Sequence, residues 1–276
     1  MIARLTRRIS RPFLYLLLIS TSIIYLMPVY VLLITGLKSF AEVDFQRMWD
    51  LPGGIYLENF QVAFETLSPN FVNSMWLVIP SAIISSVIGS INGYVFSKWK
   101  FKFSDLIFTL ILFGMFIPYQ SILIPLVQFM QQMGLRGSIA GLALVHVIYG
   151  IPIVTLIFRN YYAGVPTEIL EAGRIDGAGL AGLYRHIVFP LSIPCFVVVL
   201  IWQFTQAYND FLFAVVLTSN KTWPVTVALN NMAGSQIVQW NVQMAGSLLA
   251  ALPTLLVYVF LGRFFLRGLM AGALKG

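Results

Sequence analysis

Residues 71–97 read F-V-N-S-M-W-L-V-I-P-S-A-I-I-S-S-V-I-G-S-I-N-G-Y-V-F-S and contain no charged side chain. A helix that crosses the hydrocarbon core of a bilayer needs about 20 consecutive, mainly apolar residues. This stretch is long enough, and it lacks the alternation of apolar and polar residues that a strand of a membrane barrel would show. It predicts a membrane-spanning helix.

Working outward, five more stretches meet the same test. The spans are predicted over residues 12–37, 71–97, 106–132, 138–158, 191–219 and 244–264. The stretch 222–243 also lacks charge, but it is rich in Asn and Gln and too polar to cross. We expect it to form an external loop, with an interfacial helix near Trp240. Residues 1–276 are therefore predicted to be one all-α transmembrane domain.

The composition agrees with a membrane protein: 59% of residues are hydrophobic and 10% are charged. Soluble domains contain about 45–50% apolar and about 25% charged residues. Cys195 is the only cysteine, which rules out an intrachain disulfide. The net charge of +7 would suggest nucleic acid if the basic residues shared one polar face. They lie instead in short loops between apolar runs, so we expect lipid, and no nucleic acid, around this chain.

The basic residues also predict the orientation, because Lys and Arg are enriched in cytoplasmic loops. Alternate loops form two groups, one with thirteen basic residues and the other with four. The basic group contains both termini, which are therefore predicted to be cytoplasmic.

Polar residues within the spans are candidates for a solute path. Gln203, Gln206 and Asp210 share one helical face, and Asn209 lies beside them. Gln120 lies between two prolines of the third span. Asp210 lies about 28 Å along its helix at roughly 1.5 Å per residue, close to the outer interface. A capping or solvated acid and a residue beside the path are equally compatible with that depth.

His146 is the one histidine within a span, and we expect it to be a hydrogen-bonded packing residue. The second span carries a small residue at every fourth position: Ser81, Ser85, Gly89, Gly93 and Ser97. Such a stripe allows close approach of helices. We expect packing within this chain, with packing against a second membrane subunit as the alternative.

Motifs for catalysis are absent from the sequence. It contains no G-x-x-x-x-G-K-[ST], H-E-x-x-H or G-x-S-x-G pattern. With two histidines and one cysteine it also offers no metal site. We therefore expect no enzyme activity, no metal and no cofactor bound by this chain.

The most informative loop lies between the fourth and fifth spans, over residues 160–190. It contains P-T-E-I-L-E-A-G-R-I-D-G-A-G at 166–179. Pro166 and Thr167 are typical of a helix start, and Gly177 can take the left-handed conformation that ends a helix. We predict two short helices joined by a turn. Because many of its residues are Ala or Gly, the loop should accept close contact with a partner protein.

This loop resembles the E-A-A…G…I-x-L-P signature of permease subunits of ABC importers. The matching residues are Glu171-Ala172-Gly173, Gly177, Ile187 and Phe189-Pro190. Gly173 replaces the second alanine and Phe189 replaces the leucine. The D-G-A at 176–178, the Y-N-D at 208–210 and the tail at 268–276 are similar to those of carbohydrate-uptake permeases of the maltose type.

The resemblance implies a type I ABC importer permease bundle of six helices in a prokaryotic inner membrane. It assigns five residues of the loop to contact with an ATPase subunit: Glu171, Ala172, Gly173, Asp176 and Gly177. By position, it assigns four others to contact with a solute-binding protein: Asn230, Asn231, Ser235 and Gln236.

The implied partners are a second, different permease subunit, an ATPase dimer that carries ATP and Mg, and an extracytoplasmic solute-binding protein. In maltose-type importers the sugar site lies mainly in the partner permease, so it stays open whether the path residues of this chain touch sugar. A permease for another small solute is the nearest alternative. A stand-alone secondary transporter is a more distant one, because it should have a midplane carboxylate or inverted repeats. A membrane-embedded enzyme would need an acid–base cluster that the sequence lacks.

Overall fold

The computed structural model describes the backbone of residues 11–234 and 238–273, and the side chains of 12–234 and 238–262. All regular structure within these ranges is helical. Four helices are long and apolar enough to cross a membrane, and two bent helix pairs bring the number of possible spans in the described residues to six. The predicted all-α membrane fold is confirmed, and the predicted number of six spans is reached when each bent pair is one span.

The chain divides into two compact units. The first contains residues 1–67 and 229–250, and the second contains 68–228 and 251–276. Helices α2, Glu58–Lys98, and α12, Trp240–Ala273, have residues in both units.

In the first unit, α1 spans Arg11–Gly36 and is followed by two short turns of 3-10 helix, η2 at Phe40–Glu42 and η3 at Phe45–Arg47. The side chain of Asn59, at the start of α2, donates to the carbonyl oxygens of Gly36 and Lys38 at 2.9 and 2.8 Å. Its own carbonyl accepts from Asn241 of α12 at 2.9 Å. One buried amide therefore joins the end of α1 to the starts of α2 and α12.

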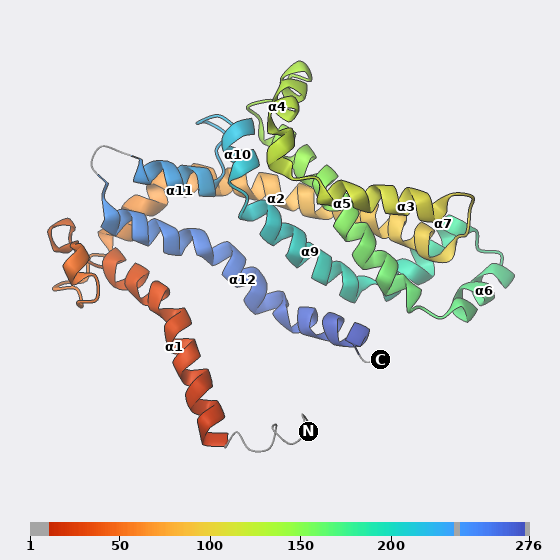
Figure 1. The fold of residues 1–276 in the computed structure, drawn as a ribbon, viewed down its shortest axis with the longest axis horizontal. Helices are drawn as coiled ribbons and strands as arrows, with labels where there is room; N and C mark the ends of the chain where they lie inside the picture. The colour runs from red at the N-terminus through yellow and green to blue at the C-terminus, as the bar shows by residue number, and fades with distance from the viewer. Residues whose placement is uncertain (1–10, 235–237, 274–276) are drawn as a thin grey trace, which may run out of the picture. The chain divides into compact units, whose positions relative to one another are not determined.

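The second unit contains the remaining elements, which Figure 1 labels in part. They are α3 Ser104–Phe113, η4 Gly114–Phe116, η5 Tyr119–Ile122, α4 Leu123–Gln132, α5 Ile139–Ala163, α6 Thr167–Ile175, α7 Leu180–Leu183, η6 Tyr184–Val188, α8 Phe189–Leu191, α9 Ile193–Tyr208, α10 Leu212–Leu217 and α11 Val225–Ala233, which extends into the first unit.

Helix α2 packs against α5 through the predicted small-residue stripe. A side chain at Gly89 would meet Val154, and one at Gly93 would meet Phe158. The Ser81 hydroxyl lies 3.3 Å from the carbonyl oxygen of Ala143. The stripe therefore packs within this chain, as expected, since only small residues allow the two backbones to approach so closely.

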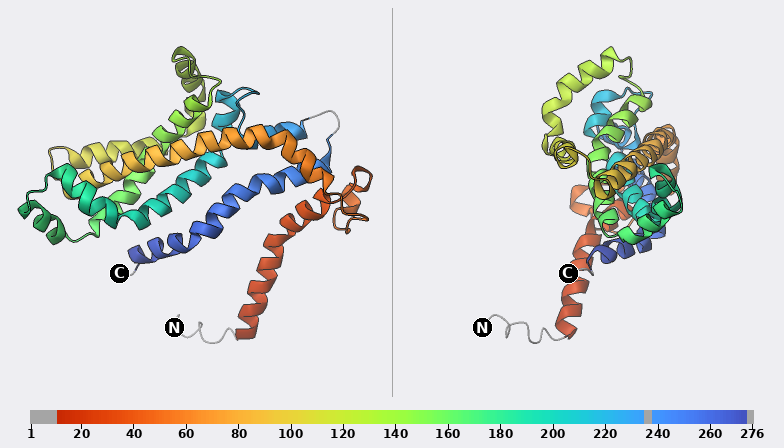
Figure 2. Two further views of the ribbon diagram at one scale, coloured as in Figure 1. Left: turned by 180° about the vertical axis from the view of Figure 1, so that it is seen from behind. Right: turned by 90° about the vertical axis from the view of Figure 1, so that its right-hand side faces the viewer.

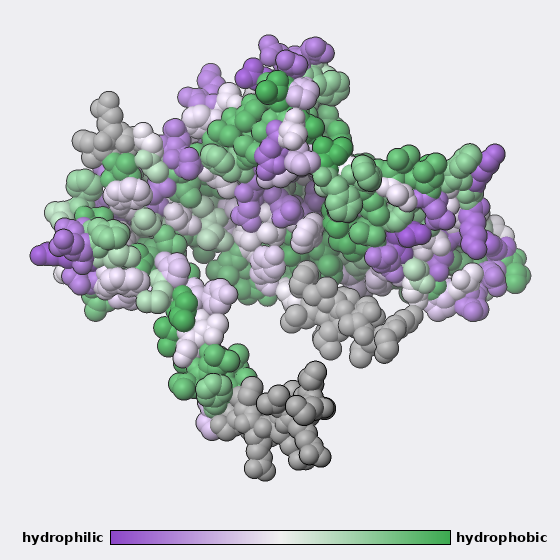
Figure 3. All heavy atoms as spheres, in the orientation of Figure 1, coloured by the Kyte–Doolittle hydropathy of each residue, from purple (hydrophilic) through white to green (hydrophobic). Residues whose placement is uncertain are grey.

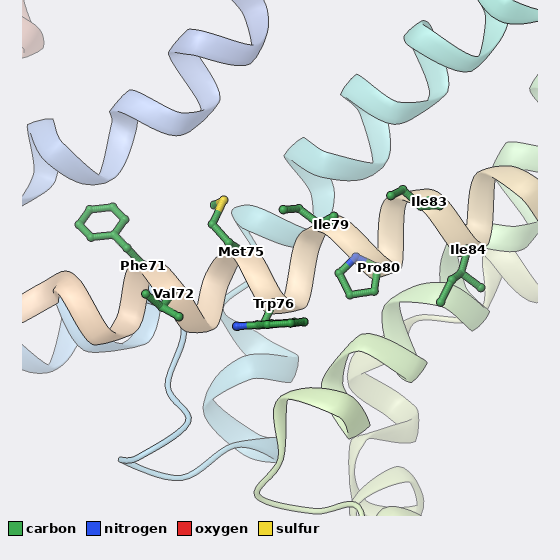
Figure 4. Close-up of a pocket in the computed structure, with 8 residues that line it drawn as sticks. All are labelled: Phe71, Val72, Met75, Trp76, Ile79, Pro80, Ile83 and Ile84. Atoms are coloured by element: carbon green, nitrogen blue, oxygen red, sulfur yellow. The ribbon is translucent and has the colours of Figure 1, made fainter.

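The opposite face of α2 is apolar and open. Figure 4 shows that its side chains form two rows along the helix, with Phe71, Met75 and Ile79 in one row and Trp76 and Pro80 in the other. Trp76 is 69% exposed in the isolated chain. Such a surface is stable in contact with lipid or with another apolar helix, which agrees with a spanning segment.

The third and fifth spans are not single straight helices. The third bends by 88° between η4 and η5, around Ile117 and Pro118. The helix pair Leu180–Leu191 and Ile193–Tyr208 bends by 75° at Ser192, where the loop meets the predicted fifth span. Within that span, α9 ends at Tyr208, before α10 begins at Leu212. Proline lacks the N–H that would continue the helical ladder, which explains the break at Pro118.

Other boundaries also differ from the prediction. Helix α2 begins at Glu58, well before the expected residue 71, and α12 begins at Trp240. The polar stretch after residue 222 contains α11, a helix that the sequence pattern did not predict.

Candidate functional site

The segment between α5 and α9 has the predicted form of two short helices joined by a turn. Helix α6 starts after Pro166, and Gly177 has φ +85°, the left-handed conformation expected of it. Backbone N–H groups of the turn satisfy the last carbonyls of α6, since Gly177 donates to Arg174 at 3.0 Å and Ala178 donates to Gly173 at 2.9 Å. The second helical piece continues as a π-helix over Tyr184–Val188, which the sequence did not predict.

Helix α6 has one buried face and one open face. Leu170 and Gly173 are buried, and a Cβ added to Gly173 would lie 2.7 Å from both Leu183 and Ile187. Gly173 thus allows α6 to lie directly on the segment that follows it.

The other four residues of the predicted contact set are all exposed: Glu171 and Ala172 lie on the open face of α6, and Asp176 and Gly177 lie in the turn that follows it. Ile175 lies among them with 87% of its surface exposed. The segment therefore presents a small-residue surface with one apolar side chain projecting from it. Figure 3 shows hydrophilic residues gathered at the end of the second unit that carries α6.

A core of aromatic and apolar side chains supports α6. Its residues come from α2, α5, α6, α7, η6 and α9: Tyr94, Val154, Phe158, Tyr162, Leu170, Leu183, Val188, Cys195 and Val199. Within it, the Ser90 hydroxyl lies 2.6 Å from the hydroxyl of Tyr162 and 3.0 Å from that of Tyr184. The views in Figures 1 and 2 agree that α6 lies at the end of the bundle formed by α5, α9 and this part of α2.

The polar residues of the fifth span divide into two faces of α9. Gln203 is 3% exposed, and its side-chain amide donates to the carbonyl oxygen of His146 at 2.9 Å. Gln203 is therefore buried in the isolated chain, with its amide bonded to α5. Gln206 and Asn209 are exposed, and Trp202, four residues before Gln206, lies on the same face. Trp202 could have been identified as a residue of this face from the sequence, because it lies one helical turn before Gln206.

Asp210 is a capping acid. Its carboxylate accepts from the backbone N–H groups of Phe213 and Ala214 at 3.4 and 3.0 Å, at the start of α10. The same carboxylate lies 3.3 Å from Nε2 of His146. His146 is buried, in agreement with the expected packing role. The Asp210–His146 pair joins α5 to the junction between α9 and α10, and the groups that bond the Asp210 carboxylate all belong to this chain.

The remaining candidates for the solute path and for binding-protein contact are exposed wherever the structure describes them. Gln120 is exposed at the break in the third span. Asn230 and Asn231 are exposed near the end of α11. Ser235 and Gln236 lie outside the described residues.

Comparison with known proteins gives consistent results. Residues 85–269 match the family described as binding-protein-dependent transport system inner membrane component. The chain is 50% identical over 186 residues to a probable ABC transporter permease of Pyrococcus horikoshii, covering 67% of this chain and 68% of the other. It is 34% identical over 265 residues to a glucose import system permease of Saccharolobus solfataricus, covering 93% and 92%.

A similar fold is found in the crystal structure of a bacterial ABC transporter involved in the import of the acidic polysaccharide alginate. The TM-score is 0.78 at 20% identity, and the match covers 91% of this chain and 94% of that chain.

Proposed function

The chain belongs to the family of binding-protein-dependent transport system inner membrane components, and from this premise we propose that it forms one membrane-spanning half of an ATP-driven sugar importer. The glucose import permease of Saccharolobus solfataricus, similar over almost its whole length, supports sugar as the solute class. The D-G-A sequence at 176–178 and the tail at 268–276 support the same class. The chain is a transport subunit, and nucleotide hydrolysis belongs to a partner chain.

The observation that carries the proposal is the two-faced structure of α6. Gly173 and Leu170 fix one face to the chain's own core, while Glu171 on the open face and Asp176 directly after the helix are exposed. We infer that the ATPase subunit docks on this open face. Gly173 then acts by packing, and the contact itself belongs to Glu171, Ala172, Asp176 and Gly177, with Ile175 added.

The proposed cycle is a switch between two states of the assembly. ATP, with Mg, binds the closed ATPase dimer more tightly than the open one. This difference in affinity shifts the assembly to the closed state, which moves α6 and changes access to the solute path. This chain would rock against a second, different permease subunit. An extracytoplasmic solute-binding protein would deliver the sugar, with Asn230 and Asn231 among its contacts.

The bias of basic residues supports an orientation with both termini and α6 in the cytoplasm of a prokaryotic cell. In that orientation Gln206 and Asn209 lie toward the outer half of the fifth span. With Trp202 they form an exposed face of one aromatic ring and two amides, groups suited to contact with the apolar and hydroxylated surfaces of a sugar. We propose this face, rather than Gln203, as the contribution of α9 to the path. Gln120, at the break in the third span, is a second candidate.

The test is ATP hydrolysis by the assembled complex in lipid nanodiscs. The binding protein is added with glucose, xylose, arabinose or maltose in turn, and stimulation over the basal rate is measured. At least one sugar should stimulate hydrolysis, and Glu171→Lys should abolish the stimulation. Glu65→Lys, on α2 and far from α6 in sequence, is the matched charge reversal and should not. Transport by the purified chain without an ATPase would instead favour a stand-alone secondary transporter.

A further inference from the structure

The end of α2 is joined directly to α6 by two consecutive residues. The ammonium group of Lys98, the last residue of α2, donates to the carbonyl oxygen of Val165 at 2.6 Å. Val165 comes two residues before the start of α6. Glu168, in the first turn of α6, attracts the same ammonium. Lys98 therefore holds the segment that leads into the helix.

The next residue contacts the other end of α6. The guanidinium carbon of Arg174 lies 4.8 Å from the ring centroid of Trp99. A guanidinium over an indole face is attracted by the ring's electron density, most strongly for Trp. Trp99 also packs against the aromatic core below α6. Together, Lys98 and Trp99 hold α6 near both of its ends, and we call this pair of residues the α2 clasp.

The turns of α2 that precede Lys98 pack closely against α5. Gly89 and Gly93 allow its backbone to lie against Val154 and Phe158. Because packed interiors do not compress, a shift of the last turns of α2 must be shared with α5. The α2 clasp is thus a direct connection from α6 to two spanning helices, separate from the covalent route through α7 and η6.

We propose that the α2 clasp transmits the movement of α6 to α2, and that Lys98 and Trp99 are positioning residues for ATP-driven transport. This inference rests on the proposed function of α6. It does not follow from the E-A-G loop itself, since Lys98 and Trp99 lie more than sixty residues earlier in the chain.

Neighbouring basic residues provide matched controls. Lys100 is exposed, and the Lys102 ammonium lies 5.0 Å from the ring of Phe103, the residue next to it. The described contacts of neither residue include α6. Lys100→Met and Lys102→Met therefore remove the same charge from the same loop without touching the clasp.

The experiment is hydrogen–deuterium exchange on the intact complex in nanodiscs, compared without nucleotide and with ATP plus orthovanadate. In the unaltered complex, exchange should change both in residues 167–175 and in residues 94–99. In Trp99→Leu and in Lys98→Met, the nucleotide-dependent change in exchange of residues 167–175 should remain. The change in residues 94–99 should fall about fivefold or more, which is the size of a typical coupling between two sites. Trp99→Phe keeps an aromatic face and should largely restore the change in 94–99.

Arg174→Gln provides a variant whose fold is not at risk, because Arg174 is exposed. It should reproduce the effect of Trp99→Leu, and combining the two should add little. If the clasp variants keep the nucleotide-dependent change in 94–99, the clasp is overturned while docking on α6 stands. If the unaltered complex shows no change in 167–175, the proposed function of α6 fails, and the clasp fails with it.

Discussion

The side-chain amide of Gln203 on α9 donates to the carbonyl oxygen of His146 on α5, at 2.9 Å. The approach is possible because Gly150, one turn after His146, has no side chain: a Cβ there would lie 2.2 Å from Nε2 of Gln203. A buried amide without a partner costs about 1–3 kcal/mol. The glycine therefore has a specific packing role in holding the two helices together.

Gly150→Ala should consequently destabilise the chain by about 1–3 kcal/mol, because the added methyl group displaces the Gln203 amide. The measurement is the midpoint of thermal unfolding of the purified protein in detergent. Gly114→Ala is the control, because nothing lies within 4 Å of the position of its Cβ. Equal midpoints for the two variants would contradict this account.

Asp210 offers a second test, because its carboxylate caps α10 and contacts His146 at the same time. Asp210→Ala should lower the free energy of unfolding by about 1–2 kcal/mol through loss of the cap alone. Hydrogen exchange in residues 212–217 should then become faster. Asp210→Asn retains an oxygen that accepts from Ala214, so its exchange should be intermediate. Unchanged exchange in Asp210→Ala would show that the cap is dispensable.

Substitutions at Gly177 test the backbone conformation of the turn, because glycine has no side chain that could contact a partner. Its φ of +85° is unfavourable for residues with a Cβ, by roughly 1 kcal/mol or more, although Asn tolerates this region better than most. Sugar-stimulated ATP hydrolysis should therefore fall in the order Gly, Asn, Ala, Pro at this position. Proline should be the most severe, since it also removes the N–H that donates to Arg174. Full stimulation in Gly177→Pro would remove this turn from the mechanism.

Glu42 makes the loop after α1 sensitive to acid. Its carboxylate accepts from the backbone N–H groups of Ser39 at 2.9 Å and Gly53 at 3.1 Å. The Ser39 hydrogen bond is the main cause that lowers the pKa of Glu42 from its ordinary value of 4.5. Because the folded pKa lies below the unfolded one, the stabilisation is present above pH 4.5 and is lost as the pH falls through the lowered pKa.

The pKa can be measured from the carboxyl ¹³C chemical shift of Glu42 as a function of pH. The midpoint should lie below 4.5, and Ser39→Pro, which removes the donating N–H, should move it upward. A midpoint at or above 4.5 in the unaltered protein would refute the hydrogen-bonded arrangement.

The sequence was sufficient to predict the features that depend on local composition. Uncharged stretches of spanning length located the helices, because burial in lipid requires apolar side chains over a fixed distance. Gly177 was recognisable as a left-handed residue, and the stripe from Ser81 to Ser97 as a packing face. Each of these signals is contained in one short segment.

Features that depend on distant segments could not be predicted in the same way. Gln203 was predicted as a path residue because helical spacing gives its face, but spacing does not show that α5 covers that face. Gly173 was assigned to the ATPase contact by the loop motif, which does not show that Leu183 and Ile187 pack against it. The prolines of the third span predict a kink, but its size of 88° could not be predicted, since only the surrounding packing determines the angle.

That bend restricts where the chain can be stable. Residues 113–121 are all exposed in the isolated subunit, and they include a turn with Ile117 in an extended conformation. Hydrocarbon offers no hydrogen bonds to a backbone that has left its helix, so water or another protein must cover this segment within the bilayer. Assembly with a partner that covers this segment would therefore stabilise the chain in the bilayer.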